Sequence, residues 1–208
     1  MIYLILTASI RNRFGAIDDA RRKERYLSAI KGTLSHLPTC ITPIIVENNG
    51  KRETYLDHFV HDGKPVRVVY TSNNETPYKN KATNEMADIK DVIRECGIQT
   101  NDMIIKLTGR YRMVSSDFFT DVIKHEKIDA FVKFYNVVTM KQEYGDCVLG
   151  CFAMRTIFIQ LYPHRLTDIQ PSAEVAFAKY VRQCGTLKEM DDLGVECCFA
   201  EDLRIVLI

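Results

Sequence analysis

The sequence predicts an α/β protein: a three-layer sandwich around a mainly parallel central sheet. Three observations support this prediction. Short apolar runs alternate along the chain with longer segments whose apolar residues recur at helical spacing. The first run, residues 2–6, is apolar at every position, as expected for a strand that is buried on both faces. Hydrophobic residues make up 46% of the 208 positions, which is enough for the core of one domain.

The first half of the chain is expected to alternate strands with helices. Tyr26, Ile30 and Leu34 recur at helical spacing, so a helix should follow the first strand. The second apolar run ends at residues 47–50, whose Glu-Asn-Asn-Gly sequence favours a turn. In chain order, we expect strands at residues 2–6, 41–46, 66–70 and 103–107, and helices at 22–37, 52–59 and 84–96.

The second half is more mixed. Two runs rich in aromatic and apolar residues predict strands at 130–135 and 148–154. Amphipathic patterns predict helices at 156–162 and 173–184, and the last apolar run, 205–208, predicts a short strand.

Composition and motif content exclude several classes of protein. A net charge of +1 argues against a nucleic-acid partner, because little would neutralise the phosphates. No apolar run is long enough for a transmembrane segment and no signal peptide is recognisable, so a soluble, cytoplasmic protein is expected. The seven cysteines should be reduced and mostly buried. The sequence lacks GxGxxG, P-loop and GxSxG motifs, which disfavours dinucleotide-dependent oxidoreductases, P-loop phosphotransferases and α/β-hydrolases.

Polar and cationic residues follow each of the first four expected strands. In an open parallel sheet, ligands bind beyond the carboxyl ends of the strands. Arginines and lysines there would suit a phosphorylated ligand, and the carboxylate of Glu47 would suit a ribose hydroxyl or a base edge. The candidate binding residues at these strand ends are Thr7, Ser9, Arg13, Glu47, Asn73, Lys81, Lys106 and Arg110.

The order of these segments resembles that of GT-A nucleotide-sugar glycosyltransferases, which have a Rossmann-like nucleotide half and an acceptor half. The resemblance covers nearly the whole chain and rests on four stretches: residues 7–11, 45–50, 78–85 and 145–156. It implies a single GT-A-like domain, 1–208, with a nucleotide-binding half, 1–112, and an acceptor-side half, 113–208. It also implies a nucleoside-diphosphate sugar as donor, and a hydroxyl of a glycan or glycoprotein as acceptor.

The sequence departs from this family where an Asp-x-Asp metal motif would follow the fourth strand. Residues 104–112 read Ile-Ile-Lys-Leu-Thr-Gly-Arg-Tyr-Arg instead, similar to a subset of bacterial and large-DNA-virus glycosyltransferase-like sequences. A departing diphosphate can be neutralised by a divalent cation, Mn²⁺ or Mg²⁺, or by Arg110, Lys106 and Lys81 in a dry site. Spacing selects no metal ligand among Asp102, Asp117 and Glu75.

Glu174 is the candidate general base, with Asp168 as the alternative. In inverting members of the family, an acidic residue at a helix start in this region takes the proton of the acceptor hydroxyl. The same residue type would also stabilise the helix start by itself, with Ser172 as the N-cap.

Two alternative functions remain at the level of the sequence. A nucleotidyltransferase would normally show a glycine-rich Arg-Lys loop after the first strand, and residues 7–14 contain no glycine. A non-catalytic nucleotide-sugar-binding domain would account for the missing Asp-x-Asp motif. The basic run at residues 21–25 is interpreted as a solvent-exposed helix start, or else as a contact for anionic membranes or an anionic acceptor.

Overall fold

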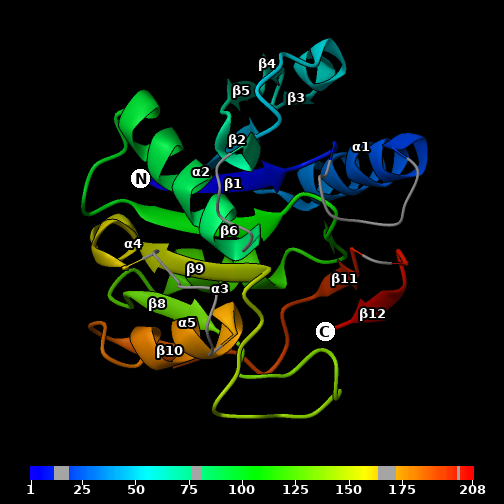
Figure 1. Cartoon of the computed structure of the whole chain (residues 1–208). Helices are drawn as coiled ribbons and strands as arrows, with labels where there is room; N and C mark the ends of the chain where they lie inside the picture. The colour runs from blue at the N-terminus through cyan, green and yellow to red at the C-terminus, as the bar shows by residue number, and fades with distance from the viewer. Residues whose placement is uncertain (12–18, 76–80, 164–171, 201) are drawn as a thin grey trace.

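The structure is a computed structural model and describes residues 1–11, 19–75, 81–163, 172–200 and 202–208 (Figure 1). The elements follow in the order β1 (Ile2–Ala8), α1 (Asp19–His36), β2 (Ile41–Glu47), η1 (Thr54–His58), β3 (Val60–His61), β4 (Lys64–Pro65), β5 (Arg67–Tyr70), η2 (Asn73–Glu75), α2 (Lys81–Cys96), β6 (Met103–Thr108), β7 (Arg112–Met113), α3 (Asp117–Lys124), β8 (Ala130–Val132), β9 (Cys151–Arg155), α4 (Thr156–Leu161), α5 (Ala173–Val181), β10 (Leu187–Glu189), β11 (Val195–Cys198) and β12 (Ile205–Leu207).

The central sheet has seven strands in the order β10-β8-β9-β6-β1-β2-β5. Strands β5, β2, β1 and β6 run parallel to one another, and β10 runs parallel to β8. Only β9 opposes its neighbours, since it pairs antiparallel with both β6 and β8. The prediction of a mainly parallel α/β sheet is therefore confirmed.

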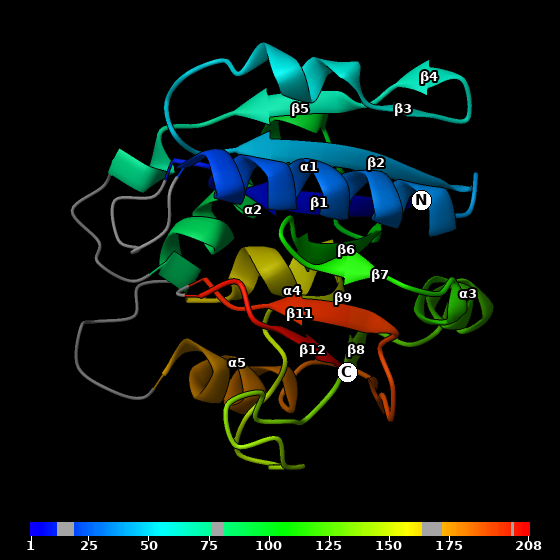
Figure 2. The same ribbon diagram turned by 90° about the vertical axis from the view of Figure 1, so that its right-hand side faces the viewer.

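Helices cover both faces of this sheet because its strands are apolar on both sides. Leu4 and Leu6 of β1 face a core that they share with α1, α3 and the small sheet β12-β11-β7. Tyr3 and Ile5 of the same strand face a second core, formed with α2, α4 and α5. Figure 2 looks onto the first of these faces, with α1 and the small sheet in front. The arrangement is the three-layer sandwich that the sequence predicted.

The loop at residues 133–150 shortens two of the predicted strands. β8 ends at Val132 and β9 begins at Cys151, because the chain between them leaves the sheet. Its ends are closed by the Val148 amide, which donates to the carbonyl of Lys133 at 3.0 Å. Residues 133–135 and 148–150, which were predicted to be strand, therefore belong to this loop, and the loop contributes to the pocket described below.

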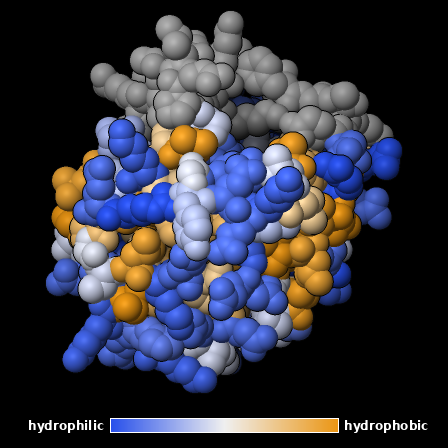
Figure 3. Space-filling model, turned by 90° about the horizontal axis from the view of Figure 1, so that it is seen from below, coloured by the Kyte–Doolittle hydropathy of each residue, from blue (hydrophilic) through white to orange (hydrophobic). Residues whose placement is uncertain are grey.

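On the face seen from below, the described residues are mainly hydrophilic, with hydrophobic groups between them, one of which lies at the right-hand side of the view (Figure 3). Single exposed apolar residues are normal for a globular surface. Among the described residues, no helix combines the length and apolar character needed to cross a bilayer. All seven cysteines are free, and five of them are buried.

The topology of the sheet fixes where a ligand can bind. From β1 the chain proceeds outward to β2 and β5, and then returns through α2 to β6 on the other side of β1. The connections that leave β1 and β6 therefore diverge and open a crevice at their carboxyl ends.

Candidate active site

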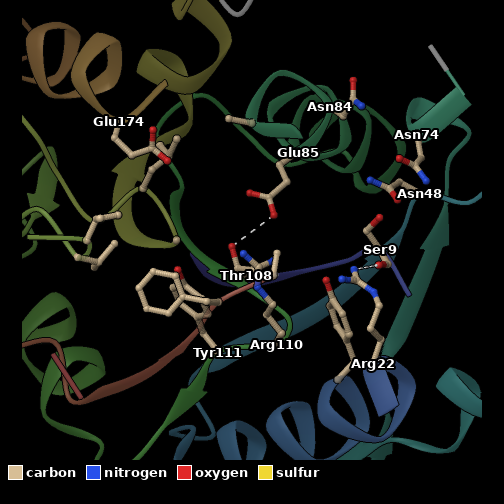
Figure 4. A pocket seen from close by; sticks show the side chains of 18 residues that line it. Ser9, Arg22, Asn48, Asn74, Asn84, Glu85, Thr108, Arg110, Tyr111 and Glu174 are labelled. Carbon is tan, nitrogen blue, oxygen red and sulfur yellow. Dashed lines mark hydrogen bonds between the residues drawn. The ribbon is translucent and has the colours of Figure 1, made fainter. Parts of the chain in front are cut away.

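A pocket of about 300 Å³ lies at the carboxyl ends of β1, β2 and β6 (Figure 4). One part of its wall is polar and comes mainly from the strand ends and from the starts of α1 and α2. These polar residues are Ser9, Arg22, Asn48, Asn74, Asn84, Glu85, Thr108 and Arg110. The other part is mainly apolar and comes from the second half of the chain. It consists of Val137, Val138, Leu149, Gly150, Phe199 and Ala200, with Glu174 at its edge.

Glu85, near the start of α2, joins the helix to the floor of the pocket. One carboxylate oxygen accepts from Lys106 Nζ at 2.7 Å, and the other accepts from the hydroxyls of Thr7 and Thr108, each at 3.3 Å. Lys106 donates also to Thr108 Oγ1 at 2.7 Å and to the carbonyl of Leu149 at 3.0 Å. Three acceptors therefore surround the ammonium group of Lys106, as a buried cation requires.

This network keeps Glu85 ionised inside the pocket. Burial by itself would raise the pKa of the carboxyl, but the positive charges of Lys106 and Arg110 lower it further than burial raises it, so that the net pKa is lowered. The side chain of Glu85 keeps 22% of its surface exposed, whereas that of Lys106 keeps 2%. The carboxylate thus faces the cavity, and the lysine lies beneath it.

Arg110 follows β6 and stands in the wall of the pocket. Its Nε donates to the carbonyl of Cys198 at 2.7 Å, and its guanidinium is hydrogen-bonded to Tyr26. Burial alone would lower the pKa of this group, but Tyr26, Tyr111 and Glu85 outweigh burial and raise it. Gly150 leaves room for the adjacent Tyr111, since a Cβ atom at position 150 would overlap the tyrosine ring.

Arg22, in the first turns of α1, is the site residue that the sequence interpretation placed wrongly. The run 21–25 was expected to be exposed to solvent, yet Arg22 is only 2% exposed and lines the pocket. Its Nη2 donates to the carbonyl of Ser9 at 2.7 Å and its Nε to that of Ile10 at 3.2 Å. The third nitrogen, Nη1, is buried and has no hydrogen-bond partner within the described ranges.

A signal for Arg22 was present in the sequence. It lies four residues before Tyr26, which is also buried, so both side chains share one face of the helix. A cation on the apolar face of an amphipathic helix is a candidate for function, whatever the charge of its neighbours.

A buried carboxyl, Asp88, holds the loops behind the pocket. It accepts from Asn48 Nδ2 at 2.9 Å, from Thr71 Oγ1 at 2.6 Å and from Asn73 Nδ2 at 2.8 Å. Burial raises the pKa of Asp88 to about 7. Because Asp88 lies on α2, it ties that helix to the ends of β2 and β5.

Glu47, at the end of β2, lies in the same buried region, and both of its carboxylate oxygens face the amide of Ile10 at 3.4 Å. Burial raises the pKa of Glu47 also to about 7. Glu47 and Asn73, two of the predicted nucleotide-binding residues, therefore contact the loops that form the wall, and neither lines the pocket.

Glu174 lies in the first turn of α5 and lines the pocket at the end opposite Ser9 and Asn48 (Figure 4). The helix is capped by Ser172, whose hydroxyl accepts from the amide of Val175 at 3.3 Å. The carboxylate of Glu174 makes no hydrogen bond to the part of the chain that the structure describes. Capping therefore belongs to Ser172, and the carboxylate is available to a ligand.

Apart from Glu47 and Asn73, the predicted site residues fall into three groups. Ser9, Arg110 and Glu174 line the pocket, while Thr7 and Lys106 reach it through Glu85. Arg13 and Asp168 lie outside the described residues, as does the side chain of Lys81. Sequence reasoning missed Arg22, Glu85 and Tyr111.

The described residues do not offer a metal site in this pocket. The only carboxylates in its described wall are Glu85, which is paired with Lys106, and Glu174 at the far edge. Asp102 binds the N-terminal ammonium at 2.6 Å beside the start of β6, the opposite end of that strand. Asp117 begins α3, and Glu75 is exposed in η2. Within the described ranges, no three metal-binding side chains cluster anywhere.

Comparison with known proteins supports the fold. No protein-family model matches the sequence, and no curated protein is similar to it. PcManGT, a mannosyltransferase from Pyrobaculum calidifontis solved with GDP-Man and Mn²⁺, matches with a TM-score of 0.55 and 10% identity, over 92% of this chain and 55% of that one. The active-site mutant Q189E of LgtC matches with a TM-score of 0.55 and 10% identity, over 86% of this chain and 70% of its own.

Residues 1–349 of TarS from S. aureus match with a TM-score of 0.56 and 10% identity, over 93% of this chain and 59% of that one. The chain thus spans between 55% and 70% of the length of these three proteins. At 10% identity the likeness concerns the fold and not the substrate. The chain has the fold of the GT-A glycosyltransferases, as the resemblance of its segments implied.

Proposed function

We propose that this protein is a glycosyltransferase that moves a sugar from a nucleoside-diphosphate sugar to a hydroxyl of a glycan or glycoprotein. The proposal rests chiefly on one observation: a pocket at the switch point of a GT-A fold, with cations at its polar end and, at the other, a carboxylate that no described residue pairs with. The structural neighbours add support at the level of the donor class, since one of them was solved with GDP-Man.

The polar end is the side that suits the nucleotide. Asn48 is 3% exposed, and its Oδ1 is buried without a hydrogen-bond partner in the part of the chain that the structure describes, so a donor on a base or ribose would satisfy it. Ser9 and Asn74 lie beside it in the same wall. Arg110 lies between this end and Glu174, where a diphosphate linking nucleoside to sugar would pass (Figure 4).

Glu85 would contact the transferred sugar. Its carboxylate faces the cavity midway between Ser9 and Glu174, and Lys106 keeps it ionised (Figure 4). A carboxylate in this position can accept hydrogen bonds from sugar hydroxyls and thereby orient the anomeric carbon.

Transfer with Glu174 as base would proceed by a single displacement. The acceptor oxygen attacks the anomeric carbon from the face opposite the diphosphate, and a new C–O bond forms as the bond to the phosphate oxygen breaks. The electron pair of the broken bond goes to the diphosphate, and the proton of the acceptor hydroxyl goes to Glu174. This route inverts the configuration at the anomeric carbon.

The test is a thermal-shift screen of nucleoside-diphosphate sugars, followed by a measurement of donor cleavage with the sugar that stabilises the protein most. We expect one donor class to raise the Tm and to be cleaved slowly even without acceptor. Binding without cleavage, with or without added acceptor glycans, would favour a non-catalytic nucleotide-sugar-binding domain. A product that retains the donor configuration would contradict the single displacement.

A further inference from the structure

We propose that Arg22, together with Arg110, binds the diphosphate of the donor directly and does in this pocket what a divalent metal does in metal-dependent relatives of the fold. The inference rests on the proposed function for the identity of the ligand, but its geometry is independent of it. It adds a diphosphate-binding residue on α1, in a run that reads as solvent-exposed in the sequence.

The first observation is the incomplete hydrogen bonding of Arg22. Two of its three guanidinium nitrogens are held by the carbonyls of Ser9 and Ile10, which fixes the plane of the group. Nη1 is buried and has no partner among the described residues, although Arg22 lines the pocket. An unpaired N–H on a buried cation is costly, and buried charges are normally paired. A ligand oxygen in the cavity would have to displace a neighbouring side chain to reach Nη1, which is closed off from solvent, and would then remove this cost.

The second observation is the charge of the pocket. Neither Arg22 nor Arg110 forms a salt bridge with a carboxylate of the described residues. Glu85 is already bound to Lys106, and Glu174 lies at the far end of the cavity. The described wall and floor of the pocket thus hold three cations, Arg22, Arg110 and Lys106, against two carboxylates, Glu85 and Glu174, and this excess of positive charge favours an anionic ligand.

The third observation is the close approach of the ends of β1 and β6. The Gly109 amide donates to the carbonyl of Thr7 at 2.8 Å, and a Cβ atom at position 109 would lie 3.0 Å from that carbonyl and 3.1 Å from the ring of Tyr26. This contact brings Arg110 and the helix that carries Arg22 to the same crevice. There, Nη1 of Arg22 and the Nη nitrogens of Arg110 are the groups left to donate to the oxygens of a diphosphate, because Arg22 Nε and Nη2 and Arg110 Nε already bind backbone carbonyls.

The test is calorimetric titration of inorganic pyrophosphate in buffer with EDTA, for the wild type and for Arg22→Met. Arg21→Met is the matched control, because Arg21 is the preceding residue of α1 and is exposed. We expect the wild type to bind pyrophosphate with EDTA present, Arg22→Met to bind at least about tenfold more weakly, and Arg21→Met to bind like the wild type. Arg22→Lys, which keeps the charge but not the planar fork, should fall between them. Circular dichroism of each variant checks that the fold is kept.

Equal affinity of Arg22→Met and the wild type would overturn the inference, as would pyrophosphate binding that appears only when Mn²⁺ is added. A second titration compares UDP and GDP with uridine and guanosine. Arg22→Met should lose affinity for UDP or GDP, which carry a diphosphate, and should keep its affinity for the corresponding nucleoside.

The outcome is also distinguishable from failure of the proposed function. Pyrophosphate binding through Arg22 in a protein that cleaves no nucleotide sugar would keep the anion site and refute the transferase. Cleavage of a nucleotide sugar at an undiminished rate by Arg22→Met would keep the transferase and refute the anion site.

Discussion

Glu85 and Lys106 form a single unit at the floor of the pocket, because each is the charge partner of the other at 2.7 Å. The sequence analysis named the lysine as a candidate for neutralising the diphosphate at the end of its strand. Because that strand is buried, the cation must find partners within the protein. The sequence did not identify Glu85 as its partner, because the way α2 packs against β6 decides which side chain of the helix reaches Lys106. Lys106 was expected to meet the diphosphate, and the structure shows it saturated by three acceptors beneath the carboxylate.

Lys106→Met should therefore destabilise the protein by leaving Glu85 half-buried and unpaired. We expect a loss of about 2 kcal/mol, less than for a fully buried pair because Glu85 is partly exposed. Adding Glu85→Gln should recover part of this loss, since it removes the unpaired charge. Urea unfolding of the two single variants and the double variant measures the coupling, and strictly additive losses would contradict the pairing.

From the sequence, Glu174 could stabilise the start of α5, act as the general base, or do both. In the structure Ser172 caps the helix, and we propose Glu174 as the base. Glu174→Gln should lower kcat about 10²- to 10⁴-fold with little change in stability, because the variant loses a proton acceptor and no hydrogen bond within the described structure. Ser172→Ala should cost about 1 kcal/mol of stability through the lost N-cap and leave kcat near that of the wild type.

Glu126→Gln is the control for the first variant, because Glu126 is exposed and does not line the pocket. Full activity of Glu174→Gln would remove the carboxylate from the mechanism, whatever its effect on stability.

The elements that the sequence predicted well are those long enough to show a period. β1, β2, β6, α1 and α2 each have six or more residues, and their apolar positions repeat clearly. β7, β10 and β11 were not expected, because segments of two to four residues carry no period and exist through pairing with distant strands. Arg22 was missed for a different reason, because the charged neighbours in the run 21–25 hid its place on the buried face that it shares with Tyr26.

Stability at neutral pH should depend on the end of β2, where burial raises the pKa of Glu47 to about 7. A carboxyl whose pKa is higher in the folded state binds more protons there, so unfolding free energy falls as pH rises from about 4.5 to about 7 and then levels off. Glu47→Gln does not titrate. We therefore expect the unfolding free energy of the variant, taken relative to that of the wild type, to be about 2–3 kcal/mol higher at pH 8 than at pH 5.

Denaturant unfolding at both pH values measures this difference, with Glu126→Gln as the exposed control. Asp88, which also has a pKa raised to about 7, should leave a residual pH dependence in Glu47→Gln. Parallel pH profiles for the variant and the wild type would contradict the assignment to Glu47.

At the scale of the whole molecule, the central sheet places a polar crevice at its strand ends next to a mainly apolar wall. The crevice follows from the order of β1, β2, β5 and β6, which the alternation of strands and helices already indicated. The apolar wall comes from residues 137–138, 149–150 and 199–200, which three separate segments bring together, so no local pattern could reveal it. The separation of a polar end and an apolar end of the pocket is therefore a property of the tertiary structure.

Cleavage of nucleoside-diphosphate sugars, followed by NMR in buffer with EDTA and in buffer with Mn²⁺, tests this account most directly. The account predicts that one donor class is cleaved with EDTA present, at a rate close to that with Mn²⁺, and that the released or transferred sugar has inverted anomeric configuration. If no donor is bound or cleaved in either buffer, the pocket is not the active site of a glycosyltransferase.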